Sequence, residues 1–451
     1  MSKVRKIPAF IIAGAASGSG KTLITLGMLE ALRRRGLVVQ AFKTGPDYID
    51  PGIHGALLGR PSYNLDTWMM GSEGVRRTFA KASSGADCAV IEGVMGLYDG
   101  RGTGEDGSTA HLSKILGVPV VLVANAEKAS RSMGALVLGF DVYDPKVDLR
   151  WAIFNRVGSP RHAEMLRASM RKSKVTLLGS VGRDKNLRMD ERHLGLVTES
   201  AQEIKEIASR AADAIERSID VDALLKGPLV KVRMTGEATP VKEKVRIGVA
   251  LDKAFSFYYR ENLDMLESLG AELCPFSPLK DESLPHDISA LYIGGGYPEI
   301  YAARLQQNEK LRHSIKKMAM GGMPVYAECG GLMYLGRALE HNGKKSRMTG
   351  IFPFTTRLLA RRKALGYREV SFTSGCPFLK KGKIRGHEFH YSEITRMPDG
   401  IKRAYREKDA GGEGFTVKNT LASYVHLHFA SNPAFASGFM KAAKKYGSRG
   451  K

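Results

Sequence analysis

Short apolar runs alternate with segments of helical spacing through the first half of the chain. Residues 9–13 predict a buried strand, residues 14–22 a glycine-rich loop and residues 23–35 a helix. Further strand-like runs follow at residues 38–42, 88–91, 118–123 and 151–154. Apolar runs of this length, separated by helix-length stretches, are typical of β-α-β units with a mostly parallel sheet. The first half is therefore predicted to be an α/β domain.

The pattern is interrupted once and then resumes. Residues 197–225 are polar with helical spacing, and residues 226–244 mix Gly, Pro, Thr, Lys and Glu without apolar periodicity. A second series of apolar runs begins at residues 245–251 and recurs at 290–293 and 324–327. The predicted organisation is a first domain over 1–225, a linker over 226–244, a second domain over 245–440, and a basic, frayed tail over 441–451.

The composition adds one observation, an excess of positively charged residues that favours an anionic partner. The chain has 451 residues, of which 43% are hydrophobic, enough for two or three globular domains. Its 69 Lys and Arg exceed its 46 Asp and Glu, for a net charge of +23. This excess favours an anionic partner, which could be nucleic acid, an anionic membrane surface or a polyanionic small molecule. No run approaches the ~20 apolar residues of a membrane span, and four scattered cysteines fit a reducing cytoplasm.

The loop between the first strand and the first helix carries a variant phosphate-binding motif. Its first glycine is Gly14, one residue earlier than the strict pattern places it, and the motif ends in Gly-Lys-Thr. Glycines let successive backbone N–H groups converge on an anion, and the helix N-terminus adds partial positive charge. The alternative is a plain glycine-rich turn. The residues expected to bind the nucleotide are Ser17, Gly18, Ser19, Gly20, Lys21 and Thr22.

Polar side chains at the carboxyl ends of predicted strands complete this candidate site. Asp47 and Asp50 follow one strand, and Glu92 ends another, at the sheet edge where ligands bind in open α/β folds. With the Thr22 hydroxyl, Asp47 and Glu92 are expected to hold Mg²⁺. Asn155 ends a further strand and could read adenine through its amide. The alternatives are turn or cap roles for the aspartates and a turn role for Asn155.

The second half contains a candidate thiol nucleophile. Cys329 follows an apolar strand and precedes two glycines and a helical run, so it is expected on a tight strand-to-helix turn. The alternative is a buried structural cysteine. A thiolate attacking an amide needs donors for the oxyanion. Gly295 and Gly296, in a glycine triplet after another strand, and Gly330 are the expected donors, unless the triplet is only a flexible turn.

Histidines at alternating positions offer a general base. His426 and His428 lie two residues apart on a strand-like run, and His426 is the preferred partner of the thiol, with His428 as runner-up. His387 and His390, three residues apart, offer two more. They could be metal ligands, but no Cys or Asp array completes a site, so hydrogen-bonded histidines near the pocket are the preferred interpretation.

These motifs occur together, in this order, in one known family. The chain resembles the cobyrinic acid a,c-diamide synthase family of cobalamin biosynthesis from about residue 8 to about residue 435. The nickel-sirohydrochlorin a,c-diamide synthases of coenzyme F430 synthesis share most of these motifs and remain an alternative. The segments that carry the resemblance are the phosphate loop and residues 45–51, 92–100, 155–162, 191–196, 294–299, 328–335, 386–392 and 423–429.

The resemblance implies a fold and a division of labour. It implies a P-loop, dethiobiotin-synthetase-like parallel-sheet domain that binds ATP with Mg²⁺. A class I glutamine amidotransferase domain of flavodoxin-like α/β fold would follow. In that branch the third, acidic member of the catalytic triad is missing, in agreement with Leu427 and His428 following His426. One departure is Asn125, where the family pattern has Asp.

The resemblance also implies the reaction and the partners. Cys329 and His426 would release ammonia from L-glutamine, and a peripheral acetate of cobyrinic acid, or of a related polycarboxylate tetrapyrrole, would be phosphorylated by ATP and amidated. Asp50 and Tyr48 would contact that substrate. The expected protein is a cytoplasmic monomer or homodimer without nucleic-acid or membrane partners. A nucleic-acid binder and a non-catalytic P-loop regulator are the rivals from other classes, and glutaminase activity separates them.

Overall fold

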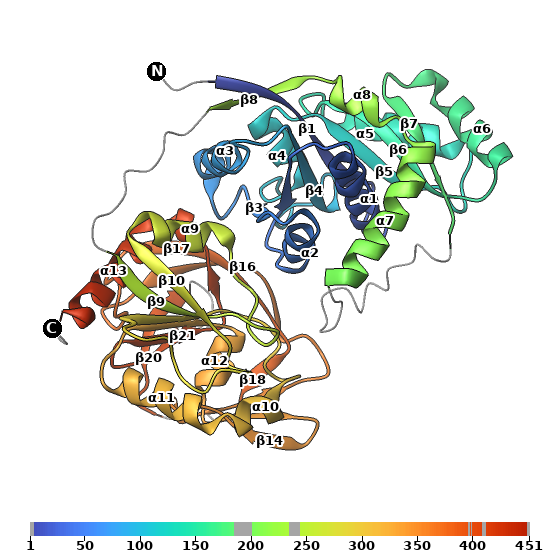
Figure 1. The fold of residues 1–451 in the computed structure, drawn as a ribbon. Coiled ribbons are helices and arrows are strands. Elements are labelled where there is room, and N and C mark those ends of the chain that lie inside the picture. Colours follow the sequence, from blue (N-terminus) through green and yellow to red (C-terminus); the bar gives the residue numbers. More distant parts are fainter. Residues whose placement is uncertain are drawn as a thin grey trace. The chain divides into compact units, whose positions relative to one another are not determined.

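The computed structural model describes residues 4–184, 201–233, 244–395, 397, 399–407 and 412–448. It forms two compact units, Met1–Glu237 and Ala238–Lys451 (Figure 1). Each unit has its own hydrophobic core. The α/β class predicted from the sequence is confirmed in both.

The first unit is built on a sheet whose path runs β3-β2-β4-β1-β5-β6-β7, with all of these neighbours parallel. The strands are β1 (Val4–Gly14), β2 (Val39–Thr44), β3 (Tyr63–Leu65), β4 (Cys88–Gly96), β5 (Val120–Asn125), β6 (Leu149–Val157), β7 (Thr176–Gly182) and β8 (Leu229–Arg233). The helices are α1 (Lys21–Arg34), α2 (Ile49–Leu58), α3 (Gly71–Ala82), α4 (Thr109–Leu116), α5 (Ser132–Tyr143), α6 (Pro160–Ser169), the 3-10 turn η1 (Met170–Lys172), α7 (Ala201–Ser218) and α8 (Val221–Leu225).

Burial of the central strands sets the architecture of the first unit. Phe10, Ile11 and Ile12 of β1 are fully buried, so both faces of this strand are covered. Because the strands are parallel, the loops after β1, β2 and β4 emerge at the same edge of the sheet. The register places Glu92 of β4 beside Ile12 of β1 and beside Lys43 of β2. The fold thereby brings the glycine-rich loop and the carboxylates to one place.

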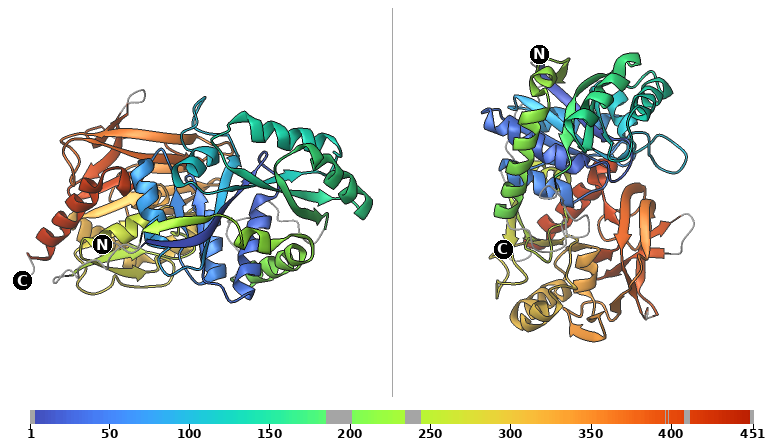
Figure 2. Two further views of the ribbon diagram at one scale, coloured as in Figure 1. Left: turned by 90° about the horizontal axis from the view of Figure 1, so that it is seen from above. Right: turned by 90° about the vertical axis from the view of Figure 1, so that its right-hand side faces the viewer.

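Two expected boundaries differ in the structure. Residues 229–233, within the expected linker, form β8, which pairs antiparallel with the start of β1, and the two strands lie side by side in Figures 1 and 2. The expected frayed tail is helical as far as Gly447, because α13 (Pro433–Gly447) buries Phe439, Met440 and Ala443 along one face. Both corrections have the same cause, since partners distant in sequence supply the hydrogen bonds or apolar contacts that hold these segments.

The second unit contains a mixed sheet with the order β10-β9-β11-β12-β21-β20-β19-β16-β17-β22 and a four-stranded sheet with the order β14-β13-β15-β18. Its strands are β9 (Val245–Ala250), β10 (Ala271–Phe276), β11 (Ala290–Ile293), β12 (Val325–Glu328), β13 (Ala338–His341), β14 (Lys344–Arg347), β15 (Thr355–Leu358), β16 (Ala364–Phe372), β17 (Lys383–His390), β18 (Ser392–Ile394), β19 (Lys402–Glu407), β20 (Gly412–Val417), β21 (Thr420–Ser423) and β22 (His426–Leu427). Its helices are α9 (Arg260–Ser268), α10 (Ala302–Gln307), α11 (Glu309–Met320), α12 (Gly330–Leu335), the 3-10 turn η3 (Phe429–Ser431) and α13.

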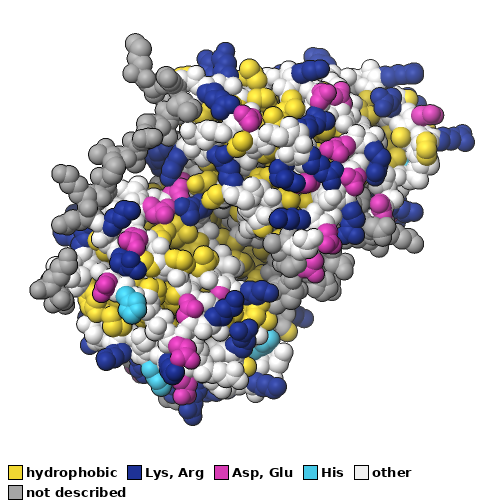
Figure 3. All heavy atoms as spheres, viewed as in Figure 1, with side chains coloured by type: hydrophobic (Ala, Val, Ile, Leu, Met, Phe, Trp, Pro, Cys, Tyr) yellow, Lys and Arg dark blue, Asp and Glu magenta, His cyan; other side chains and the backbone are white. Residues whose placement is uncertain are grey.

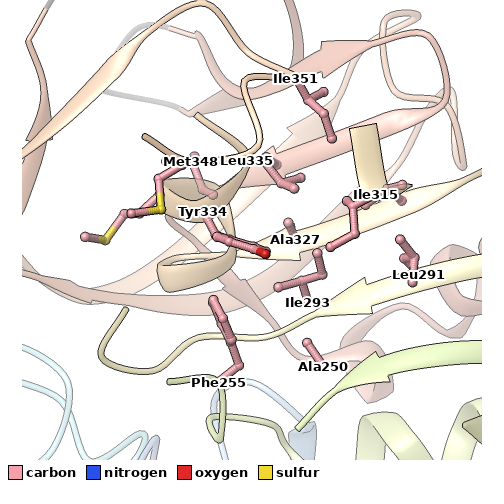
Figure 4. Close-up of a cluster of buried hydrophobic side chains, with 14 of the residues drawn as sticks. Ala250, Phe255, Leu291, Ile293, Ile315, Ala327, Tyr334, Leu335, Met348 and Ile351 are labelled. Carbon is pink, nitrogen blue, oxygen red and sulfur yellow. The ribbon is translucent and has the colours of Figure 1, made fainter. Parts of the chain in front are cut away.

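A buried cluster supports the end of β12 and the short helix after it (Figure 4). Tyr334 of α12 packs its ring 5.2 Å from that of Phe255, measured between ring centroids. Ile293, the last residue of β11, and Ala327, the next-to-last residue of β12, are fully buried in the same cluster. Dense packing of this kind fixes the turn between β12 and α12, because a well-packed core has few alternative arrangements.

Two candidate active sites

The glycine-rich loop of the first unit is braced by its own side chains. Gly18 and Gly20 adopt φ angles of 78° and 86°, in the left-handed region that glycine tolerates. The Ser19 hydroxyl accepts from the Ala16 N–H at 3.1 Å and donates to the Ala16 carbonyl at 2.6 Å. The loop leads into α1, whose first residue is Lys21. The helix N-terminus and the lysine ammonium therefore share one end of the loop, as an anion site requires.

Asn155 supports the same loop from β6. Its side-chain amide donates to the Ser19 carbonyl at 3.0 Å, and its carbonyl oxygen accepts from the Arg156 N–H at 2.9 Å. A Cβ on Gly20 would lie 2.2 Å from the Asn155 amide nitrogen, so the two residues fit closely. The structure thus gives Asn155 a loop-positioning contact. The expected adenine contact stays a prediction.

Glu92 is the centre of the hydrogen-bond network behind the loop. Its carboxylate is fully buried and accepts from the Thr22 hydroxyl at 2.6 Å and from Lys43 Nζ at 3.0 Å, both at Oε1. Its Oε2 lies 2.9 Å from His54 Nε2. Thr22 and Glu92, nominated from the sequence as Mg²⁺ ligands, therefore lie in direct contact. Their hard oxygens suit Mg²⁺, which commonly uses one or two protein ligands together with phosphates and water.

Lys43 was not singled out from the sequence. Its ammonium group is buried and lies 2.5 Å from Asp50 Oδ2 and 3.7 Å from Asp47 Oδ2, in addition to its contact with Glu92. The available signal was a lysine near the end of a predicted strand, shortly before the loop that carries Asp47 and Asp50. A charge buried in a sheet needs partners, so its position could have been connected with these carboxylates.

The charges in this network shift one another's proton affinities. Burial alone would lower the pKa of Lys43, but Glu92, Asp50 and Asp47 raise it above the ordinary value. For Glu92, burial acts to raise the pKa, whereas Lys43, His54 and Thr22 lower it further than burial raises it. Burial and the neighbouring Glu92 raise the pKa of Asp50. Burial and Lys43 lower the pKa of Lys21.

Asp47 caps a helix and also lies at the phosphate-loop site. Its Oδ1 accepts from the backbone N–H groups of Ile49 and Asp50, at 2.8 and 3.2 Å, and so caps the start of α2. Its other oxygen is the one that faces Lys43. Both interpretations of this residue, cap and site group, are therefore compatible with the structure. Tyr48 directly precedes α2 and is half-buried.

In the second unit, Cys329 stands at the junction of β12 and α12. Its backbone has φ 47° and ψ −100°, an unusual conformation for a residue with a side chain. Its N–H donates to the Ser423 carbonyl at 2.7 Å, which ties the turn to the neighbouring strand β21. Its Sγ lies 3.9 Å from the Phe389 carbonyl oxygen. The expected strand-to-helix elbow is thus present. The other three cysteines are buried in the unit cores.

The glycines around this turn permit close backbone approach. A Cβ on Gly330 would lie 3.1 Å from the Gly296 nitrogen, and one on Gly296 would lie 2.2 Å from the Ala254 carbonyl oxygen. A Cβ on Gly295 would lie 2.5 Å from Cε1 and 3.4 Å from Nε2 of His426. The structure therefore brings the glycine triplet, the Cys329 turn and the His426 imidazole together. Side chains at these glycines would collide with the site.

The two candidate bases have different surroundings. The His426 ring stacks on that of His387, with 5.0 Å between ring centroids, and faces Gly295. The His428 ring packs 4.7 Å from the ring of Tyr259. Burial lowers the pKa of His428 to about 3 and also lowers that of His387. Both flanking histidines are therefore neutral near pH 7, and His426 is the one beside the glycine turn.

Acidic groups surround the thiol. Burial, followed by Glu299, Glu328 and Glu388, raises the pKa of Cys329, whereas the Gly330 N–H opposes this shift. Burial also raises the pKa of Glu299 to about 7. The resting thiol is therefore protonated, and an adjacent base is needed to activate it.

The remaining expected histidine is hydrogen-bonded, as the sequence suggested. His390 Nε2 lies 2.7 Å from Glu388 Oε1, and Arg368 Nε donates to Glu388 Oε2 at 2.7 Å. The His390 ring also stacks on Tyr424, with 3.8 Å between centroids. Within the described ranges, no group of three or more His, Cys, Asp or Glu side chains is arranged to hold a metal ion.

Charge is dispersed on the face drawn in Figure 3, where Lys and Arg side chains lie among acidic ones over both units. Basic side chains between residues 357 and 368 are paired with acids: Arg357 lies 2.7 Å from Glu393, and Arg368 lies 2.7 Å from Glu388. The motif at residues 191–196 lies outside the described residues. Across the described part of the chain, no helix is both long and apolar enough to cross a membrane.

Comparison with known proteins covers both units. Residues 10–197 match the family described as CobQ/CobB/MinD/ParA nucleotide binding domain, and residues 246–434 match the CobB/CobQ-like glutamine amidotransferase domain. Cobyrinate a,c-diamide synthase of Syntrophotalea carbinolica is 45% identical, with 96% of this chain and 98% of that protein covered. The enzymes of the same name from Archaeoglobus fulgidus and Dehalococcoides mccartyi are 44% and 41% identical, each with 97% of this chain covered and 98% and 99% of the relatives.

Proposed function

Since this chain belongs to the family of cobyrinate a,c-diamide synthases, we propose that it amidates two acetate side chains of cobyrinic acid, using ATP and glutamine. The observation that carries the proposal is the presence, in one chain, of a phosphate-loop site and a cysteine elbow packed against the glycine triplet that meets His426. A nucleotide-binding unit alone would explain only the first half. The enzyme is an amidoligase in which one unit releases nitrogen and the other activates the acid that receives it.

Nitrogen release takes place at Cys329. Its thiol gives a proton to His426, and its sulfur adds to the side-chain amide carbon of glutamine. The N–H groups of Gly296 and Gly330 donate to the oxyanion that forms. Gly295 was also expected as a donor, but its N–H is already engaged by the Phe257 carbonyl at 3.2 Å. Collapse of this intermediate expels ammonia and leaves a thioester, which water hydrolyses to glutamate. The close fit of Gly295 against the His426 ring supports this assignment.

Activation of the acid takes place at the phosphate loop. An acetate oxygen of the tetrapyrrole attacks the ATP γ-phosphorus, ADP leaves, and ammonia then displaces phosphate from the acyl phosphate. Gly18, Gly20 and Lys21 hold the phosphates through backbone N–H groups and the ammonium. Asp50 and Tyr48 contact the substrate.

The same network prepares the site for a metal. Mg²⁺ bound through Thr22, Asp47 and Glu92 would neutralise phosphate charge and orient the triphosphate. Lys43 supplies positive charge next to Glu92 and Asp50, so that the carboxylates do not repel one another or the anionic substrates. A tetrapyrrole with many carboxylates also suits a chain with a net charge of +23.

The proposed setting is the cytoplasm, supported by four cysteines that form no disulfide. The proposed assembly is a monomer or a homodimer.

The test is a mass-spectrometric assay with cobyrinic acid, ATP, Mg²⁺ and glutamine, in which two hydroxyl-to-amide exchanges are expected. Cys329→Ala should lose glutamine-dependent turnover and retain turnover with an ammonium salt. Parallel reactions with nickel sirohydrochlorin and with metal-free tetrapyrroles decide the substrate. Turnover of the nickel compound alone would reassign the enzyme to coenzyme F430 synthesis. Absence of any glutaminase activity would overturn the amidotransferase assignment.

A further inference from the structure

A buried carboxylate lies beside the imidazole of His426. The distance between His426 Nδ1 and Glu328 Oε2 is 3.7 Å, and both side chains are almost fully buried. The acid does not come from the positions after His426, where Leu427 and His428 stand. It comes from the last residue of β12, immediately before Cys329. The residue that precedes the thiol in sequence therefore faces the base that serves it.

The Glu328 carboxylate is held by donors from three strands. Its Oε1 accepts from the Tyr326 hydroxyl of β12 at 2.5 Å and from the Leu427 N–H of β22 at 3.0 Å. Its Oε2 accepts from the Tyr292 hydroxyl of β11 at 3.0 Å. Burial, and then the charge of Glu328, raise the pKa of both tyrosines, so their hydroxyls remain protonated donors. The carboxylate is thus fixed, with Oε2 directed toward the imidazole.

The two ring nitrogens of His426 have different neighbours. Nδ1 faces Glu328, whereas Nε2 lies on the side of Gly295, 3.4 Å from where a Cβ of that glycine would stand. Another titratable group at the ring is His387 of β17, which stacks on it and is neutral. Glu328 is consequently the charged group that faces Nδ1 among the contacts described.

We propose that Glu328 is the positioning residue for His426 and takes the place of the acid missing after it. It keeps the imidazole proton on Nδ1, so that the lone pair of Nε2 is free to accept the thiol proton. Its charge stabilises the imidazolium when that proton arrives. As the Sγ–carbon bond forms, the proton rests on Nε2, and it then passes to the departing ammonia. The present distance is longer than a hydrogen bond and shortens as the ring becomes charged.

This inference rests on the proposed function, and its first test is Glu328→Gln. A glutamine amide can donate to Nδ1, which would select the tautomer with the proton on Nε2 and block its use as a base. We expect glutaminase kcat to fall by roughly 10²-fold or more, with the KM for glutamine unchanged. Removal of the negative charge should also move the acidic limb of the kcat/KM profile to lower pH. Turnover with an ammonium salt should remain at the wild-type level.

Matched controls separate positioning from support of the fold. Glu413→Gln alters another carboxylate that bridges backbone and hydroxyl groups, since Glu413 accepts from the Ser423 hydroxyl at 2.5 Å and the Tyr424 N–H at 2.8 Å. It should leave the pH profile unmoved. Glu328→Asp retains the charge and should recover part of kcat with the wild-type profile. An unmoved profile in Glu328→Gln, or an equal loss of ammonium-dependent turnover, would overturn the inference.

If Glu328→Gln does not fold, a measurement on the wild-type enzyme still tests the inference. Nitrogen NMR of the histidine side chains should show neutral His426 with its proton on Nδ1, whereas a proton on Nε2 would overturn the inference. Wild-type glutaminase activity and its loss in Cys329→Ala test the proposed function separately. The proposed function can therefore stand while the role of Glu328 fails.

Discussion

The phosphate-loop site of the first unit and the thiol site of the second treat buried charge in opposite ways. In the first, the Lys43 ammonium is already in contact with the carboxyl groups of Asp50 and Glu92. In the second, burial keeps the Cys329 thiol protonated, and the flanking His387 and His428 neutral. One site holds its charges in advance, whereas the other creates a charge pair during the reaction.

The difference matches the substrates proposed for each site. A triphosphate and a carboxylate arrive with charge, and a prearranged ionic network can receive them without large reorganisation. Glutamine presents a neutral amide to the thiol, and a resting thiolate there would be exposed to oxidation and other side reactions. The contrast predicts that substitutions in the first unit act through charge balance, and those in the second through proton transfer.

The largest expected effect comes from Lys21→Ala, which removes the phosphate-loop ammonium. Amidation with either glutamine or an ammonium salt should fall by roughly 10³-fold or more, because both nitrogen sources need the activated acid. Glutamine hydrolysis should persist. Parallel assays of tetrapyrrole amidation and glutamate release measure the two activities. Lys174→Ala, on the surface, is the control, and retained amidation in Lys21→Ala would contradict the role of the loop.

Lys43→Met should break the ionic network of the first unit. Loss of the ammonium leaves buried carboxylates without their cation, at a cost of about 3–5 kcal/mol in the free energy of unfolding. The double variant Lys43→Met with Asp50→Asn should recover part of this loss, because one of the uncompensated charges is gone. Hydrogen exchange of the β2 and β4 amides in the full chain measures the local free energy of opening.

The same variant has a pH signature. The wild-type network lowers the pKa of Glu92, so its stabilising effect is present above the ordinary glutamate value of 4.5 and is lost as the pH falls below it. The stability difference between wild type and Lys43→Met should therefore shrink as the pH is lowered from neutrality through about 4.5. A difference that is constant with pH would contradict an electrostatic origin.

His54→Ala should give an intermediate effect on the first unit alone. His54 lies 2.9 Å from Glu92 Oε2 and so orients the carboxylate whose other oxygen meets Thr22. We expect a loss of roughly 10- to 100-fold in amidation at limiting Mg²⁺, with recovery at higher Mg²⁺ and unchanged glutaminase activity. A Mg²⁺ titration of the amidation rate provides the measurement. A loss that no Mg²⁺ concentration reverses would show that His54 has another role.

The smallest effect is expected from Glu299→Gln in the second unit. After burial, Glu299 is the largest cause of the raised pKa of Cys329, so its neutralisation should lower the thiol pKa and speed alkylation near neutral pH. The increase in the rate with iodoacetamide should be less than about tenfold. Because the pKa of Glu299 is about 7, the effect should grow as the pH rises through that value. Glu282→Gln, an exposed acid paired with Lys310, is the control.

The expectations drawn from the sequence succeeded where chemistry depends on local order. The strand–loop–helix context of Lys21 and Thr22 was readable because it depends on neighbours in the chain. Glu92 was expected at a strand end, but β4 (Cys88–Gly96) continues past it. Lys43, His54 and Glu328 were not assigned roles, because their partners lie up to 99 residues away in the sequence. A lysine or glutamate in an apolar strand signals that a partner exists but does not identify it.

The sequence by itself determined the α/β class, the order of the two units, the phosphate loop and the cysteine elbow, because periodicity, glycine positions and strand ends are local properties. The tertiary structure decided which charges meet. It paired Lys43 with three carboxylates, turned Asn155 onto the loop, and set Glu328 against His426 through strands that are distant in sequence. It also drew β8 into the first sheet and extended α13 into the expected tail. These outcomes depend on register and packing between remote segments, and a linear pattern does not contain that information.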